Sequence, residues 1–340
     1  MNLERWIKRT AWVSLVMVYL VIIAGSVVRM TGSGMGCPDW PKCFGLAIPP
    51  TNIDEVSWHA EEPYNAGRMI VRNDTLWVAQ STFVSGPTFD QSNWKPYDKH
   101  DYAIFNPMHT WVEFINRLIG ALTGLPVLIL FSLSLIFAFR NRKLYYFILS
   151  AATLFMLGFE AWLGKLVVDG NLIPGSITIH MLGSAVLIFL LLAIIRRSEV
   201  KIHVLKTQRL LMFGGLFLLM SQIIMGTQVR ELVDDLLHSG VERGADLIGA
   251  LPSIFTFHRS FSWLNVLIFL FWFRSMKKQT TVMKEVHVVG AMLFLQLLAG
   301  ITLTYGGMPQ AMQPVHLLSA LIMLGAYWSA WVRTRTNAPA

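Results

Sequence analysis

The sequence predicts an all-α membrane protein in which eight transmembrane helices form two pseudo-symmetric four-helix bundles. Of the 340 residues, 54% are hydrophobic and only 14% are charged, whereas a soluble domain carries about 25% charged residues. Apolar runs of about 20 residues, each long enough to cross a bilayer, recur along the chain. Helices are the expected form because every backbone polar group must be paired inside lipid. Finally, the same sequence features return in the second half of the chain.

The eight expected segments cover residues 11–29, 109–138, 145–165, 175–195, 210–228, 253–273, 286–305 and 314–332. Lysines and arginines gather in the connections on one side, for example at Arg140, Arg142 and Lys143. The positive-inside rule then places both termini in the cytoplasm. Because topology explains the net charge of +8, that charge does not indicate binding to nucleic acid. The basic and then apolar N-terminus lacks a clear cleavage site, so we expect it to stay as the first helix of a cell (inner) membrane protein.

Matching residues indicate that one four-helix unit occurs twice. The pairs are Gly25–Arg29 with Gly226–Arg230, Asn116–Arg117 with His258–Arg259, Glu160 and Gly164 with Gln296 and Gly300, and His180 with His316. Four helices return the chain to the side where it began, so the two copies should be parallel. We expect an N-terminal half at 1–200, with a long outer loop at about 30–107, and a C-terminal half at 201–340.

The long outer loop contains both cysteines of the chain, Cys37 and Cys43. The topology places them in an oxidising compartment, where a disulfide can persist. Two free thiols are the alternative, and a zinc site would need more ligands nearby than the loop offers. Further along, DTLWVAQSTFV and GPTFDQSNW alternate as strands do, which suggests a small hairpin. We assign no catalytic role to the loop.

Three histidines lie inside apolar helices: His180, His258 and His316. Asn116 occupies the corresponding place in a fourth helix. An ionisable side chain at membrane depth is a candidate for function, and neutral imidazole is a common axial ligand of haem iron. All four lie in the first turns of helices that run inward, so they should sit in the outer part of the bilayer. Facing helices at similar depth can hold a cofactor between them.

The two halves differ in how many histidines they offer. His258 and His316 would form a bis-histidine site, which suits electron transfer because both axial positions of the iron are filled. In the N-terminal half His180 would leave one axial position open, which suits oxygen or substrate chemistry. The alternative is that these groups are unrelated and bond carbonyl groups between helices.

Glu113 is the expected catalytic residue, because it lies three residues before Asn116 on the same helical face. Its carboxyl group should be protonated, paired with Arg117 or Arg29, or active as a proton relay. His109 lies about 10 Å along the helix axis from Asn116. It would ligate the same iron only if the helix were shifted. Whether His109 or Asn116 replaces the missing ligand therefore stays open.

Arginines near the outer helix ends could bind haem propionates with their forked donors. They are Arg29, Arg117, Arg230 and Arg259. Equally, they could snorkel or pair with Glu113 and Glu231. Glu160 and Lys165, near the end of the third helix, are expected to pair with each other or to snorkel.

Beyond these patterns, the chain resembles the haem A synthase family over nearly its whole length. The segment GSVVRMTGSGMGCPDWPKCFG is similar to the family's first helix end and cysteine loop. VEFINR is similar to its Glu-x-x-His-Arg motif, and the other histidines match by position. Asn116 departs from this motif, where a histidine is usual. Our hypothesis is that His180 alone ligates the substrate iron and that Asn116 faces the open side as a hydrogen-bonding group.

The resemblance implies haem b on His258 and His316, and the substrate haem O near His180, Glu113 and Arg117. It implies oxidation of a ring methyl group of haem O to a formyl group, through hydroxylated intermediates. The electrons would come from an outside donor, quinol or another. The product, haem A, would serve terminal oxidase assembly, and a haem O synthase would be a partner. The cysteine disulfide is implied to lie beside the substrate site.

Two other functions fit part of the pattern. One is a di-haem b-type cytochrome that takes electrons from quinol without modifying its haem. The other is a haem transporter with parallel repeats. Glu113 and the cysteine pair favour the enzyme, since a pure electron carrier needs neither.

Overall fold

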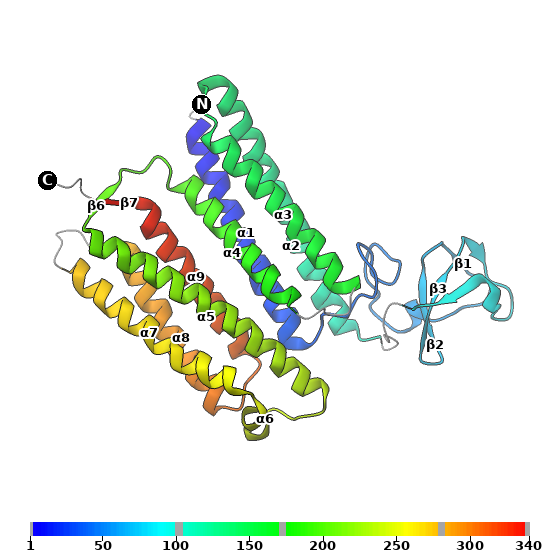
Figure 1. The fold of residues 1–340 in the computed structure, drawn as a ribbon. Coiled ribbons are helices and arrows are strands. Elements are labelled where there is room, and N and C mark those ends of the chain that lie inside the picture. The colour runs from blue at the N-terminus through cyan, green and yellow to red at the C-terminus, as the bar shows by residue number, and fades with distance from the viewer. Residues whose placement is uncertain (1–2, 99–104, 170–174, 278–282, 337–340) are drawn as a thin grey trace. The chain divides into compact units, whose positions relative to one another are not determined.

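The computed structural model describes residues 3–98, 105–169, 175–277 and 283–336 (Figure 1). Eight of its helices are long and apolar enough to cross a membrane, which confirms the predicted all-α, multi-pass fold. They are α1 (Leu3–Thr31), α2 (Pro107–Asn141), α3 (Tyr145–Asp169), α4 (Ser176–Ile195), α5 (Lys206–His238), α7 (Ser253–Met276), α8 (Lys284–Tyr305) and α9 (Met312–Arg333). The short α6 (Ala245–Ala250) precedes α7, so α7, α8 and α9 are the sixth to eighth spans.

Several helices are longer than their apolar runs. The sequence predicts the end of the fifth helix near residue 228, but α5 continues to His238. The added turns are amphipathic, and Val233 is buried in a cluster with Leu247 of α6 and Leu303 of α8. Tertiary packing therefore extends the helix beyond the part that lipid requires.

The structure divides into two compact units. The bundle unit comprises Met1–Ile23, Leu122–Glu160 and Ile177–Ala340, and the loop unit comprises Ala24–Ala121 and Ala161–Ser176. This division cuts through α1, α2 and α3. The predicted halves at 1–200 and 201–340, and their symmetry, therefore stay predictions.

The core of the bundle unit surrounds α9, which packs against α8 and α5. Tyr19 of α1 donates a hydrogen bond to the carbonyl oxygen of Leu321 at 3.3 Å. The Trp328 indole donates to the carbonyl oxygen of Phe189 in α4 at 2.9 Å. One helix of the C-terminal half thus contacts two helices of the N-terminal half. At the end of α9, β7 (Thr334–Thr336) pairs in parallel with β6 (Ile202–Val204), two strands that the sequence did not predict.

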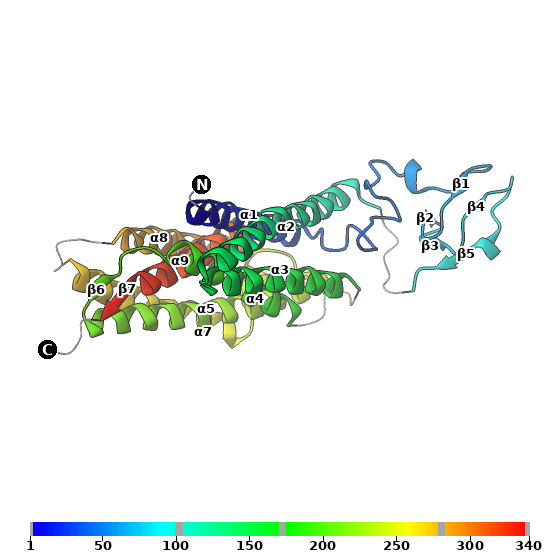
Figure 2. The ribbon, with the colours of Figure 1, turned by 90° about the horizontal axis from the view of Figure 1, so that it is seen from above.

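The loop unit contains a small sheet and a separate two-stranded pair (Figure 2). The sheet has the antiparallel order β2–β3–β5, and β1 pairs with β4. The bounds are β1 (Pro63–Tyr64), β2 (Met69–Arg72), β3 (Thr75–Ala79), β4 (Phe83–Val84) and β5 (Trp94–Pro96). Asn73 and Asp74 both have positive φ, which suits the two-residue turn between β2 and β3.

The predicted hairpin is correct only in part. The first alternating segment, 74–84, contains β3 and β4, whereas the second, 86–94, contributes only its last residue, Trp94, to β5, the antiparallel neighbour of β3. However, the hairpin turn joins β2 to β3, and β4 leaves the sheet to pair with β1. An aromatic cluster of Tyr64, Phe83 and Trp94 is the reason, because it packs the β1–β4 pair against the start of β5.

Candidate functional site

His258 of α7 and His316 of α9 lie next to each other in the bundle unit. Their ring centroids are 6.4 Å apart, with 73° between the ring planes. In each ring Nδ1 is buried and has no hydrogen-bond partner among the described residues. A metal–nitrogen bond of about 2 Å on each side, added to two ring radii, gives roughly 6 Å between ring centres. The spacing therefore leaves room for one metal atom between the rings.

Both histidines are supported in the same way by the preceding membrane span, which is α5 for His258 and α8 for His316. The Gln222 amide donates to the carbonyl oxygen of His258 at 2.7 Å, and the Gln296 amide donates to that of His316. A Cβ added at Gly226 would lie 3.2 Å from Cε1 of His258, and one at Gly300 would lie 3.7 Å from Cε1 of His316. A glutamine thus holds each histidine's backbone, and a glycine allows the ring to lie close to the neighbouring helix.

His180 of α4 has a carboxylate as its neighbour. Its Nδ1 lies 2.7 Å from Oε2 of Glu160 in α3, and the two side chains are 43% and 8% exposed. A Cβ at Gly183 would overlap the Glu160 carboxyl group, so the glycine makes space for it. Residue spacing predicted that Glu160 would pair with Lys165 or snorkel, and it did not indicate this contact with His180. The sequence repeat could have indicated this contact. Glu160 and His180 correspond in the repeat to Gln296 and His316, and the Gln296 side chain contacts the backbone of His316.

Glu113 is 3% exposed and belongs to the loop unit. Its carboxylate pairs with Arg117 and accepts a hydrogen bond from the backbone N–H of Cys37 at 2.8 Å. Of the sequence alternatives, the structure therefore shows a glutamate paired with Arg117. Arg117 also donates to the carbonyl oxygens of Asp39 at 2.6 Å and Lys42 at 3.1 Å.

Cys37 and Cys43 form the predicted disulfide, and both are buried. The Thr110 hydroxyl donates to the carbonyl oxygen of Gly36 at 2.8 Å. A Cβ at Gly36 would collide with the backbone carbonyl of His109, so the loop packs directly on the first turn of α2. The ring of residues 37–43, which we term the cysteine loop, is thus fixed at the first turns of α2 by Thr110, Glu113 and Arg117.

Asn116 has a buried amide oxygen without a hydrogen-bond partner among the residues that the structure describes. A Cβ at Gly25 of α1 would lie 3.7 Å from that oxygen. Asn116 thus lies against a glycine of α1, as His258 lies against Gly226 of α5. The predicted repeat pairs Asn116 with His258 and Gly25 with Gly226, so the two contacts are equivalent in that prediction.

The arginines expected at haem propionates have varied surroundings. Arg230 pairs with Asp234 at 2.7 Å. The guanidinium of Arg259 lies 5.9 Å from the centre of the Phe255 ring, and Arg29 is in the last turn of α1. Their binding to propionates stays a prediction, as does a ligand role for His109.

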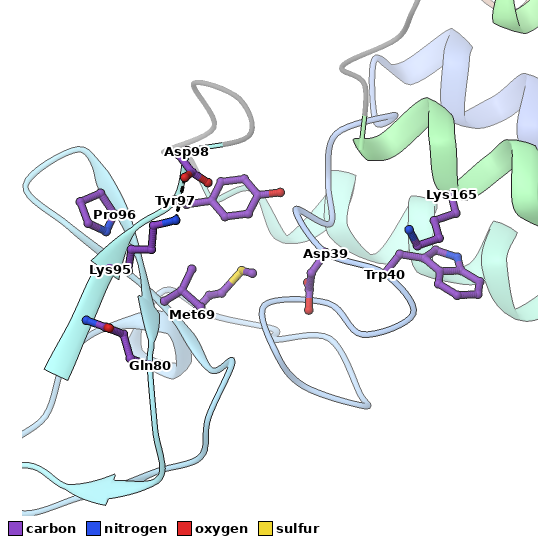
Figure 3. Close-up of a pocket in the computed structure, with 10 residues that line it drawn as sticks. Asp39, Trp40, Met69, Gln80, Lys95, Pro96, Tyr97, Asp98 and Lys165 are labelled. Atoms are coloured by element: carbon purple, nitrogen blue, oxygen red, sulfur yellow. Dashed lines mark hydrogen bonds and ion pairs between the residues drawn. The ribbon is translucent and has the colours of Figure 1, made fainter.

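A cavity of about 370 Å³ lies within the loop unit, between the sheet, the cysteine loop and α3 (Figure 3). Figure 3 shows the ion pair of Lys95 and Asp98 on one side and Asp39 and Trp40 on the other. Burial raises the pKa of Asp39, and the N–H of Gly45 donates to its carboxylate at 2.9 Å. None of the predicted haem ligands lines this cavity.

Comparison with known proteins gives one family. The model of the COX15-CtaA family, described as cytochrome oxidase assembly protein, matches residues 8–70 and 66–328. A Heme A synthase of Shewanella oneidensis is 30% identical over 65% of this chain and 55% of its own length. The Heme A synthase of Rickettsia canadensis is 25% identical over 45% of this chain. The Heme A synthase of Flavobacterium johnsoniae is 23% identical over 92% of this chain.

These matches cover 38% of the Rickettsia protein and 92% of the Flavobacterium protein. The chain thus spans about half the length of the Shewanella relative that it matches. The family model covers nearly all eight spans and both histidines of the 6.4 Å pair. The chain therefore belongs to the COX15-CtaA family of cytochrome oxidase assembly proteins.

Proposed function

We propose that the protein is a haem A synthase, which oxidises a ring methyl group of haem O to a formyl group. The observation that carries the proposal is the contrast between two histidine sites in a member of this family. His258 and His316 lie at the spacing of two ligands to one metal atom. His180 instead has a carboxylate against one ring nitrogen and a ring that is 43% exposed.

In this proposal His258 and His316 hold haem b. Among the described residues, no three His, Cys, Asp or Glu side chains gather into a metal site. An ion between the two imidazoles would therefore need further donors, which a porphyrin ring provides. With both axial positions filled, the bound haem supplies one-electron transfer. Gln222 and Gln296 fix the backbone of the two ligands.

His180 would ligate the iron of the substrate haem O, and Asn116 would face the open side. Glu113 is the proposed catalytic residue, a carboxyl group that handles protons during oxidation of the methyl group. Arg117 and the N–H of Cys37 hold this carboxyl group in place. The Cys37–Cys43 disulfide would lie beside the substrate site. Arg29, Arg230 and Arg259 would bind propionates at the outer surface.

The wider setting follows from the same proposal. The protein lies in the cell membrane with both termini in the cytoplasm, and the halves 1–200 and 201–340 hold substrate and resident haem. A haem O synthase supplies the substrate, quinol or another membrane donor supplies electrons, and haem A goes to terminal oxidases.

The test is co-expression with a source of haem O, followed by chromatography of the extracted haems. The proposal expects haem A from the wild type and none from His180→Ala. Haem O that returns unchanged beside two stable haems would instead support a di-haem cytochrome. Net haem flux into liposomes without conversion would support a transporter.

A further inference from the structure

Glu160 is a buried acidic side chain that the proposed reaction does not yet use. It lies on α3, 8% exposed, with Oε2 at 2.7 Å from Nδ1 of His180. The His180 ring is 43% exposed, so the carboxylate covers one edge while much of the ring stays accessible. An isolated carboxyl group among apolar helices is costly, and a histidine partner offsets that cost.

The fold makes space for this contact. Gly183 follows His180 by three residues, and a Cβ there would overlap both the Glu160 carboxyl group and the end of Met156. Ser184 donates its hydroxyl to the carbonyl oxygen of His180 at 3.1 Å, which occupies that carbonyl within α4. The carboxyl group therefore reaches the imidazole ring through a gap that only glycine leaves open.

The corresponding residue in the other half behaves differently. Gln296 donates to the carbonyl oxygen of His316 and lies 3.0 Å from the hydroxyl of Ser319. It therefore holds the backbone rather than the ring. Among the described residues Nδ1 of His180, His258 and His316 makes no aligned hydrogen bond. At His180, however, a carboxylate oxygen lies 2.7 Å from Nδ1. Among His180, His258 and His316, the ring contact with a carboxylate occurs at His180, the histidine of the proposed substrate half.

A carboxylate on Nδ1 has defined effects on a metal-binding histidine. When it accepts the Nδ1–H of the ring, the lone pair of the neutral imidazole lies on Nε2 and the ring orientation is fixed. It also makes the imidazole a more basic ligand, which favours the ferric over the ferrous state of a bound iron. Such a contact therefore fixes the orientation of the histidine ring and lowers the reduction potential of an iron that has a single histidine ligand.

We propose that Glu160 is a positioning residue that holds His180 with Nε2 directed to the iron of haem O and strengthens it as an axial ligand. The inference rests on the proposed function, since it needs haem O at His180. It assigns to this chain a carboxylate–histidine–iron arrangement at the substrate and a plain bis-histidine arrangement at the resident haem.

The test uses Glu160→Gln in the full-length protein, purified with its resident haem and then loaded with haem O. Resonance Raman spectra of the ferrous form should show a lower iron–histidine stretching frequency than in the wild type. The midpoint potential of the substrate haem should rise, and its affinity should fall by roughly 10- to 100-fold. The spectrum of the resident haem should stay unchanged, which shows that the bundle is folded. Glu242→Gln, the same change at an exposed position of the bundle unit, should leave all these values unchanged.

Gly183→Ala is the second variant, because its methyl group displaces the carboxylate while Glu160 remains. It should shift the frequency and potential in the same direction. If haem O binds through His180 in a folded variant with wild-type frequency and potential, the inference is wrong and the proposed function stands. If His180→Ala leaves the spectrum of added haem O unchanged, the substrate site itself is wrong, and the proposed function fails with it.

Discussion

At the scale of single residues, the site depends on small differences between equivalent positions. His258 lies against Gly226, whereas Asn116 lies against Gly25 with an amide in place of an imidazole. An asparagine offers no ring nitrogen, and its oxygen is a weak ligand for haem iron. Under the proposed function, one side of the substrate iron would therefore stay open for chemistry.

Asn116→His should close that side. A histidine at 116 would lie against Gly25 as His258 lies against Gly226. Under the proposed function we therefore expect it to bind the iron of haem O as a second axial ligand. Electron paramagnetic resonance should then show a six-coordinate low-spin signal, and haem A output should fall. His109→Ala should leave the wild-type spectrum unchanged. If the wild type already gives a low-spin signal that His109→Ala removes, His180 is not the sole ligand.

Glu113→Gln tests the proposed catalytic carboxyl group. Glutamine can still accept the N–H of Cys37, but it cannot exchange a proton. We expect haem A formation to slow by roughly 10²- to 10⁴-fold, the usual contribution of general acid–base catalysis. Haem b content, measured optically, should be retained. Glu62→Gln, an exposed change in the same unit, should have no effect, and normal output from Glu113→Gln would exclude a required carboxyl group.

At the scale of elements, Arg117 joins α2 to the cysteine loop. Its guanidinium donates to the carbonyl oxygens of Cys37, Asp39 and Lys42 while it pairs with Glu113. Five donors in one planar group suit this set, which a lysine could not satisfy. Arg117 therefore binds three carbonyl oxygens of the loop at once, in addition to the contacts that Thr110 and Glu113 make.

Arg117→Ala should release the cysteine loop. Removing one partner of a buried ion pair costs about 3–5 kcal/mol, and here it also leaves the three carbonyl oxygens without this donor. We expect the buried disulfide to be reduced by added thiol at least ~100-fold faster, since 1.4 kcal/mol corresponds to tenfold. Labelling of the released thiols measures this rate. Arg72→Ala, which removes a guanidinium 4.0 Å from the Phe89 ring, is the matched control. Equal reduction rates in both variants would contradict the role of Arg117.

The sequence predicts elements well where the signal is local. Each span is an apolar run, and lipid requires a helix there regardless of its neighbours. The last turns of α5 depend on Val233 meeting Leu247, and β4 depends on pairing with β1 about 20 residues earlier. The contact of Glu160 with His180 depends on how α3 and α4 are rotated about their axes, which residue spacing alone does not specify.

At the scale of the whole molecule, ion pairs join helices from both halves of the chain within the bundle unit. Arg333 of α9 binds Glu285 of α8 at 2.8 Å and Glu199, just after α4, at 2.8 Å. Arg196 also binds Glu199 at 2.7 Å. With the contacts of Tyr19 and Trp328, these pairs make the N-terminal and C-terminal helices parts of one bundle. His180, His258 and His316 all belong to this bundle unit, and the proposed function gives them separate roles.

His316→Ala tests that separation of roles. Loss of one axial ligand should remove haem b or make its iron five-coordinate, because His258 alone cannot fill both axial positions. Without the resident haem, electrons should no longer reach the substrate, so haem A formation should stop. Haem O should still bind at His180, and its iron–histidine stretching frequency should match that of the wild type. His203→Ala, at an exposed histidine of β6, should retain both haems and activity. If His316→Ala loses haem b yet still produces haem A at the wild-type rate, the resident haem does not supply electrons to the reaction.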